Sequence, residues 1–174
     1  MGGLSNEPVF SRHPTWPPPP RASVVHDHPR HGRLWMGGAH SRHGLEVTVE
    51  DFSRALVIDC AGDLSDDHRG RAGSWLSCVF ADLEVYPSQI DRIGETARKA
   101  AWLLHTDEPT EVYVFCQYGM NRSGLVTGLV LRELGVGAEE AVDRIRTARP
   151  GALSNLTFLN LIHSYRPAGP VTGT

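Results

Sequence analysis

The chain has 174 residues, of which 40% are hydrophobic, and a formal net charge of −3 at pH 7. This length is sufficient for one domain with a substantial core. The slightly acidic balance excludes a global basic field that would attract nucleic acid. No apolar run approaches the length of a membrane span. We therefore expect one globular domain that neither crosses a membrane nor binds nucleic acid through its overall charge.

The three cysteines, Cys60, Cys78 and Cys116, form an odd and sparse set. Such a set indicates a reducing compartment rather than a disulfide framework. The first ten residues also lack the basic and apolar stretches of a signal peptide. We therefore predict a cytoplasmic protein. Cys60 and Cys78 lie in apolar runs and are interpreted as buried thiols; a redox partnership of either with Cys116 is the less favoured alternative.

Residues 1–30 hold seven of the twelve prolines, including the run Pro17–Pro20. Such a segment favours extended polyproline II conformations and cannot build a packed core. We predict a flexible tail over 1–30, a folded domain over 31–167 and a short C-terminal tail over 168–174.

Within the domain, segments typical of strands alternate with segments typical of helices. Strands are expected over 33–38, 55–60, 77–81 and 112–115, and the continuous apolar run of 55–60 indicates a buried parallel strand. Residues 47–54 are read as a short helix or turn and 61–74 as a loop. Helices are expected over 89–104 (capped by Ser88), 124–134 (ended by Gly135), 138–149 (stopped by Pro150) and 155–165 (capped by Ser154). This order predicts an α/β fold with a central, mostly parallel sheet flanked by helices on both faces.

The most informative stretch runs from the strand that ends near Cys116 to the helix that follows Arg122. A strand that feeds a short loop and then a helix forms an anion site, because the loop amides and the helix dipole present positive charge. Gly119 allows the loop to turn, and Arg122 offers a planar fork that matches two phosphate oxygens. Surroundings of this kind keep a cysteine as the nucleophilic thiolate.

The pattern C-x-x-G-x-x-R-S over 116–123 resembles the signature loop of cysteine-dependent phosphatases, in the small, atypical dual-specificity branch of the protein tyrosine phosphatase superfamily. The predicted first strand over 33–38 is also similar to the opening strand of that family. The resemblance implies a protein-tyrosine-phosphatase-like fold and hydrolysis of phosphomonoesters through a phosphocysteine intermediate, with no metal or cofactor. It implies phosphate binding by the loop residues Gln117, Tyr118, Gly119, Met120, Asn121 and Arg122.

The resemblance also assigns roles to single residues. Cys116 is the expected nucleophile, and Ser123 is expected to donate a hydrogen bond to the departing thiolate. The family places an Asp on a mobile loop between a strand and a helix, roughly thirty residues before the Cys, as general acid and then base. Asp82 stands at such a position. The rivals are Asp63, Asp66 and Asp67, which lie much farther upstream in the preceding loop, and Glu84, which is a nearer alternative.

One position departs from the family. The family usually has His immediately before the Cys, and here it is Phe115. The nucleophile and the phosphate fork remain, so we predict a working enzyme with a higher pH optimum.

The expected partners are phosphorylated proteins or peptides, dephosphorylated at tyrosine and at serine or threonine. Asn121 before Arg122 is similar to the RNA 5′-triphosphatase branch, which is one alternative. A phosphoinositide phosphatase is another, although the loop lacks the Lys or Arg that such enzymes tend to carry there. A phosphate-binding pseudophosphatase module and a rhodanese-like sulfurtransferase stay open as further classes.

Overall fold

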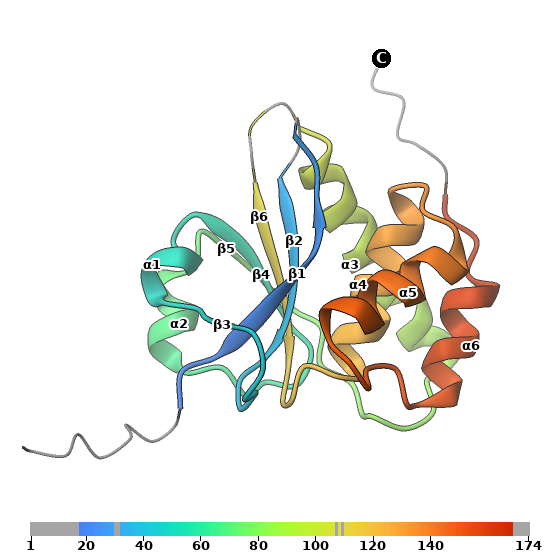
Figure 1. The fold of residues 1–174 in the computed structure, drawn as a ribbon, viewed down its shortest axis with the longest axis horizontal. Coiled ribbons are helices and arrows are strands. Elements are labelled where there is room, and N and C mark those ends of the chain that lie inside the picture. The colour runs from blue at the N-terminus through green and yellow to red at the C-terminus, as the bar shows by residue number, and fades with distance from the viewer. Residues whose placement is uncertain (1–17, 30–31, 107, 109, 169–174) are drawn as a thin grey trace, which may run out of the picture.

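The computed structural model describes residues 18–29, 32–106, 108 and 110–168 (Figure 1). The strands are β1 (Arg21–Asp27), β2 (Arg33–Gly38), β3 (Leu45–Glu46), β4 (Ala55–Asp59), β5 (Ser74–Ser77) and β6 (Glu111–Cys116). The helices are α1 (Val49–Phe52), α2 (Asp66–Arg71), α3 (Pro87–Leu104), α4 (Arg122–Glu133), α5 (Ala138–Ala148) and α6 (Leu156–Ser164). Among these described helices, none combines the length and the apolar character needed to cross a bilayer.

The strands form one six-stranded sheet in the order β3-β1-β2-β6-β4-β5. β2, β6, β4 and β5 run parallel, whereas β1 and β3 pair antiparallel at one edge. β6 lies between β2 and β4, so its carboxyl end, where Cys116 stands, has a strand on either side. The predicted α/β fold with a mostly parallel sheet is confirmed.

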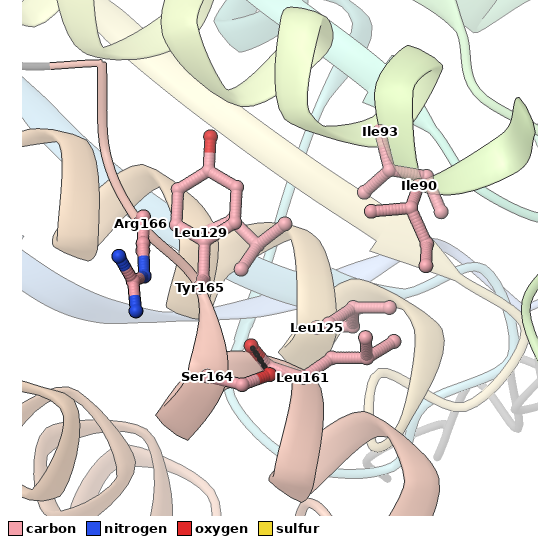
Figure 2. A pocket seen from close by; sticks show the side chains of 8 residues that line it. All are labelled: Ile90, Ile93, Leu125, Leu129, Leu161, Ser164, Tyr165 and Arg166. Carbon is pink, nitrogen blue, oxygen red and sulfur yellow. Dashed lines mark hydrogen bonds between the residues drawn. The ribbon is translucent and has the colours of Figure 1, made fainter. Parts of the chain in front are cut away.

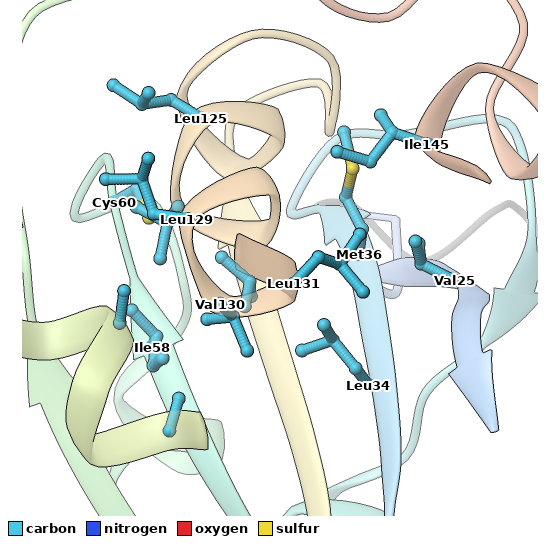
Figure 3. Close-up of a cluster of buried hydrophobic side chains, with 14 of the residues drawn as sticks. Val25, Leu34, Met36, Ile58, Cys60, Leu125, Leu129, Val130, Leu131 and Ile145 are labelled. Carbon is cyan, nitrogen blue, oxygen red and sulfur yellow. The ribbon is translucent and has the colours of Figure 1, made fainter. Parts of the chain in front are cut away.

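Helices cover both faces of the sheet, as predicted. Figure 1 shows α3, α4, α5 and α6 on one face and the short α1 and α2 on the other. The larger apolar cluster lies under α4, whose side chains pack between those of β4 and those of β2 (Figure 3). The smaller cluster lies under α1 and contains Phe52.

Side chains alternate between these two cores along β6. Val114 and Cys116 belong to the larger cluster, whereas Tyr113 and Phe115 belong to the smaller one. Phe115 is fully buried, and its ring centroid lies 5.4 Å from that of Phe52. The residue that departs from the family pattern therefore fills the second core. Its effect on the pH optimum stays a prediction.

The prediction that residues 1–30 form a tail is wrong for 21–27. These residues form β1, which pairs with β2 along its length. A register shift between Val24 and His26 breaks the alternation of buried and exposed positions that would otherwise mark a strand. The proline-rich part before residue 18 lies outside the described residues.

Two predictions between residues 61 and 81 are also wrong. The expected loop over 61–74 contains α2, which has no buried residue and is begun by the Ser65 cap, so it lacks an apolar period. The strand expected over 77–81 lies earlier, at β5. Cys78 and Phe80 are buried, but their amides donate only to Asp59 O, at the end of β4, and to Cys60 O, and the regular pairing of β4 with β5 ends at Ser77.

The predicted helix caps differ at two places. Helix α3 begins at Pro87 after the cap residue Tyr86, whose amide donates to the Gln89 side chain at 3.0 Å, rather than at the expected cap Ser88. Helix α6 is capped by Asn155, one residue after the expected Ser154. The remaining helix predictions agree with α4, α5 and the body of α3 within two residues at each end.

Candidate active site

The loop between β6 and α4 has all its carbonyl oxygens turned outward. Six consecutive carbonyls accept a hydrogen bond from a donor: Cys116 O from Ala39 N (2.9 Å), Gln117 O from His40 N (2.8 Å), Tyr118 O and Gly119 O from the Arg149 guanidinium (3.2 and 2.6 Å), Met120 O from Leu153 N (3.1 Å) and Asn121 O from Leu125 N (2.8 Å).

This pattern fixes the direction of the amides. In a planar trans peptide, the N–H of the next residue points opposite to the carbonyl. The amides of residues 117–122 therefore point into the loop. The Gly119 amide confirms the direction, since it donates to Cys116 Sγ at 3.3 Å. Such a ring of inward amides is a concave anion-binding site.

Gly119 permits this tight ring. Its φ is +71°, and a Cβ there would lie 2.5 Å from the backbone of Gly37. Both the left-handed conformation and the close approach to β2 require a residue without a side chain.

The Cys116 thiol is buried at the floor of the loop, with Ser123 beside it. The Ser123 hydroxyl oxygen lies 3.2 Å from Cys116 Sγ and is itself fully buried. The Ser123 hydroxyl is within hydrogen-bond distance of the sulfur, so it can donate to a departing thiolate.

Arg122 opens α4 beside this ring. Its Nη1 donates to Phe80 O at 3.4 Å. Its Nε is buried and has no hydrogen-bond partner among the described residues. A buried donor of this kind requires an acceptor, and an oxyanion inside the loop can supply one.

The Asp82 carboxylate is hydrogen-bonded to two asparagines, Asn121 of the loop between β6 and α4 and Asn155. It accepts from Asn121 Nδ2 at 3.1 Å and from Asn155 Nδ2 at 2.9 Å. The backbone N–H of Asn155 in turn donates to Asn121 Oδ1 at 3.2 Å. The structure therefore brings Asp82 to the rim of the loop.

Two of the rival acids lie elsewhere: Asp66 and Asp67 are on α2, on the face of the sheet opposite α4 (Figure 1). Glu84 lies on the same loop as Asp82, two residues later. Asp82 is the acid that contacts the residue next to Arg122.

Sequence reasoning missed Arg149, which stands behind the loop. This guanidinium is buried and makes six hydrogen bonds. Besides the two loop carbonyls, its partners are Ser23 Oγ, Met36 O, Ser41 Oγ and His43 O. Burial lowers the pKa of Arg149, and the nearby Cys116 opposes that shift. Arg149 thus joins the loop to β1, to β2 and to the segment between β2 and β3, and it places positive charge near the sulfur.

Replacing Arg149 by Met is expected to lower the free energy of unfolding by about 3–5 kcal/mol, because several buried carbonyls would lose their donor together. Urea denaturation of the purified protein measures this change. The control Arg54→Met removes an exposed guanidinium and is expected to shift stability by less than about 0.5 kcal/mol. A loss below about 1 kcal/mol for Arg149→Met would show that the loop does not depend on this residue.

Cys60 and Cys78 are buried free thiols, as predicted. Burial raises the pKa of the Cys60 thiol well above its ordinary value, and the neighbouring Cys78 and Cys116 raise it further. Burial also raises the pKa of Cys78. Both thiols are thus held in the protonated, weakly nucleophilic form.

A separate cavity of about 330 Å³ lies between α3, α4 and α6. Figure 2 shows Ile90 and Ile93 of α3 on one side of it and Tyr165 and Arg166 on the other. None of the candidate catalytic residues lines this cavity. This cavity is therefore separate from the loop between β6 and α4, which holds the candidate catalytic residues.

The sequence matches no family model and no curated protein. Solved structures do match. Human DUSP28 has a TM-score of 0.60 at 20% identity, over 83% of this chain and 91% of its own. Tk-PTP in its active form has a TM-score of 0.58 at 16% identity, over 84% of this chain and 95% of its own. Kinase associated phosphatase with its catalytic-site cysteine changed to serine has a TM-score of 0.59 at 18% identity, over 83% of this chain and 93% of its own.

These matches extend over nearly the whole length of the neighbours, and all three are phosphatases by name. At such identities the likeness establishes the architecture. The chain therefore has the fold of the small dual-specificity type of protein tyrosine phosphatase.

Proposed function

We propose that this protein is a cysteine-dependent phosphatase that hydrolyses phosphomonoesters of tyrosine and of serine or threonine in proteins. The observation that carries the proposal is a loop whose carbonyls all accept hydrogen bonds from donors other than the Cys116 sulfur, while the Gly119 amide donates to that sulfur and the buried Arg122 Nε has no partner among the described residues. A tetrahedral oxyanion held there has its phosphorus within reach of the sulfur.

In the first step, the Cys116 thiolate attacks phosphorus in line with the ester oxygen. The S–P bond forms, the P–O bond breaks, and Asp82 gives its proton to the leaving oxygen. The loop amides and the Arg122 guanidinium stabilise the charge on the three equatorial oxygens.

In the second step, water attacks the phosphocysteine and Asp82 takes a proton from that water. The S–P bond breaks, and the thiolate leaves with a hydrogen bond from Ser123. Phosphate is released and Cys116 returns to its starting form. Every proton and bond in this cycle is accounted for by this chain's own residues and water.

The alternatives within the superfamily have weaker support. The Asn121 side chain, which suggested the RNA 5′-triphosphatase branch, is engaged by Asp82 and Asn155. The other exposed side chains of the loop carry no positive charge, which a phosphoinositide headgroup or an RNA chain would favour.

Hydrolysis of a small aryl phosphate tests the proposal. The wild-type protein is expected to release phosphate from it and to transfer no sulfur from thiosulfate. Binding of a phosphotyrosyl peptide without hydrolysis of any ester would support the pseudophosphatase module instead, and sulfur transfer would support a sulfurtransferase.

Replacing Asp82 by Asn is expected to slow hydrolysis by an amount that depends on the leaving group. The rate on phenyl phosphate falls about 10²–10³-fold, because an alkoxide or phenoxide of high basicity needs the proton. The rate on a dinitrophenyl phosphate falls less than about threefold, because that leaving group departs unprotonated. Steady-state rates on the two esters measure this difference.

The matched control is Asp63→Asn, which removes a rival acid of the upstream loop and should change neither rate. An equal loss on both esters in Asp82→Asn would contradict the role of Asp82 as general acid.

A further inference from the structure

A cavity of about 660 Å³ adjoins the candidate active site on the side of the general acid. Its wall includes Asp82 and Asn155, which belong to the catalytic network described above. Asp82 delivers its proton to the leaving oxygen, so the part of a substrate attached to that oxygen must pass this wall. The cavity is therefore placed to receive the body of the substrate rather than its phosphate.

Two large apolar side chains, Leu83 and Tyr86, line this cavity beside polar residues such as Gln89 and Thr157. Leu83 and Tyr86 are 71% and 69% exposed, which places them among the most exposed large apolar side chains in the described part of the chain. Exposed apolar side chains that gather at the edge of a cavity indicate a binding surface.

The charge of the cavity narrows the choice of ligand. Asp82 and Glu84 line it, and among the described residues that line it there is no Lys, Arg or His. A polyanion such as an RNA chain or a multiply phosphorylated headgroup would meet two carboxylates without a cation to offset them. A neutral apolar group would meet the Leu83 and Tyr86 side chains without such a cost.

We propose that this cavity is a specificity subsite for a large apolar side chain next to the phosphorylated residue of a peptide substrate, and that it disfavours an acidic side chain at that place. The proposal rests on the proposed phosphatase function and adds the class of sequence that the site prefers. A volume of this size accommodates one large side chain together with the adjacent backbone.

The test compares two phosphotyrosyl peptides that differ only in having Leu or Glu on both sides of the phosphotyrosine. Their affinities are measured by calorimetry with the Cys116→Ser variant, which binds without turnover, and their kcat/KM values with the wild type. We expect the Leu peptide to be preferred about tenfold in both measurements. The double variant Leu83→Ala/Tyr86→Ala is expected to remove this preference by raising the KM of the Leu peptide. Its kcat/KM should fall more on the Leu peptide than on a small aryl phosphate.

Trp102→Ala is the matched control, because it removes an exposed apolar side chain of α3 that does not line the cavity. It should leave the preference intact. Equal affinity for the two peptides, or a preference that survives the double variant, would overturn the subsite. So would faster hydrolysis of a phosphoinositide or of 5′-triphosphorylated RNA than of the Leu peptide.

The two proposals fail separately. A wild-type protein that hydrolyses no ester, while its Cys116→Ser variant still prefers the Leu peptide, would contradict the phosphatase function and support the subsite. Hydrolysis of esters by the wild-type protein without a preference for the Leu peptide would support the phosphatase function and contradict the subsite.

Discussion

Replacing Cys116 by Ser is expected to lower the rate of aryl phosphate hydrolysis by about 10⁴-fold or more, because an un-ionised hydroxyl is a far weaker nucleophile than a thiolate. The fold and the anion site should survive the change. Serine is smaller than cysteine, and its oxygen can still accept the hydrogen bond that Gly119 donates to sulfur. Steady-state kinetics measures the rate, and calorimetric titration with a phosphotyrosyl peptide measures the affinity of the anion site.

Cys78→Ala is the control for this prediction. Cys78 is also buried in the larger apolar cluster, but it takes no part in the proposed chemistry. Its removal should change the rate less than about threefold. Residual activity of Cys116→Ser close to that of the wild type would show that another group performs the attack.

Replacing Arg122 by Lys is expected to lower kcat/KM by about 10³-fold, because the positive charge stays but the planar fork that grips two oxygens is lost. The Arg122 guanidinium keeps donors available for a ligand. Its Nε is buried without a partner among the described residues, and its Nη1 donates to Phe80 O. Rates on an aryl phosphate at several substrate concentrations separate the loss in binding from the loss in the chemical step.

Arg144→Lys is the matched control. Arg144 lies on α5, where it pairs with Glu140, so the same exchange there should leave the kinetics unchanged. A loss below about tenfold in Arg122→Lys would contradict a bidentate role for the guanidinium.

The order of strands and helices around Cys116 could be predicted from the sequence because the signals there are local. β4 and β6 are continuous apolar runs, and the helix after the loop has an apolar period and a closing Gly135. β1 could not be predicted, because its pairing with β2 is a tertiary interaction and a register shift interrupts its alternation. Helix α2 could not be predicted either, because none of its residues is buried and its sequence therefore has no apolar period.

The candidate site was predictable only where its residues are neighbours in sequence. Cys116, Arg122 and Ser123 belong to one short pattern. Arg149 stands at the end of a helix, before a proline, and nothing in its neighbourhood indicates that it reaches back to Gly119. Asn155 was passed over for Ser154 as a cap, although it caps α6 and also holds Asp82.

The central claim is that a covalent bond forms between the Cys116 sulfur and phosphorus. The most direct test is a rapid acid quench of the wild-type protein during hydrolysis of dinitrophenyl phosphate, followed by mass spectrometry of the peptide that contains Cys116. The account predicts one phosphoryl group on Cys116 and a burst of dinitrophenol equal to the amount of enzyme. Turnover without a burst and without phosphorylated Cys116, or a phosphoryl group on another residue, would contradict it.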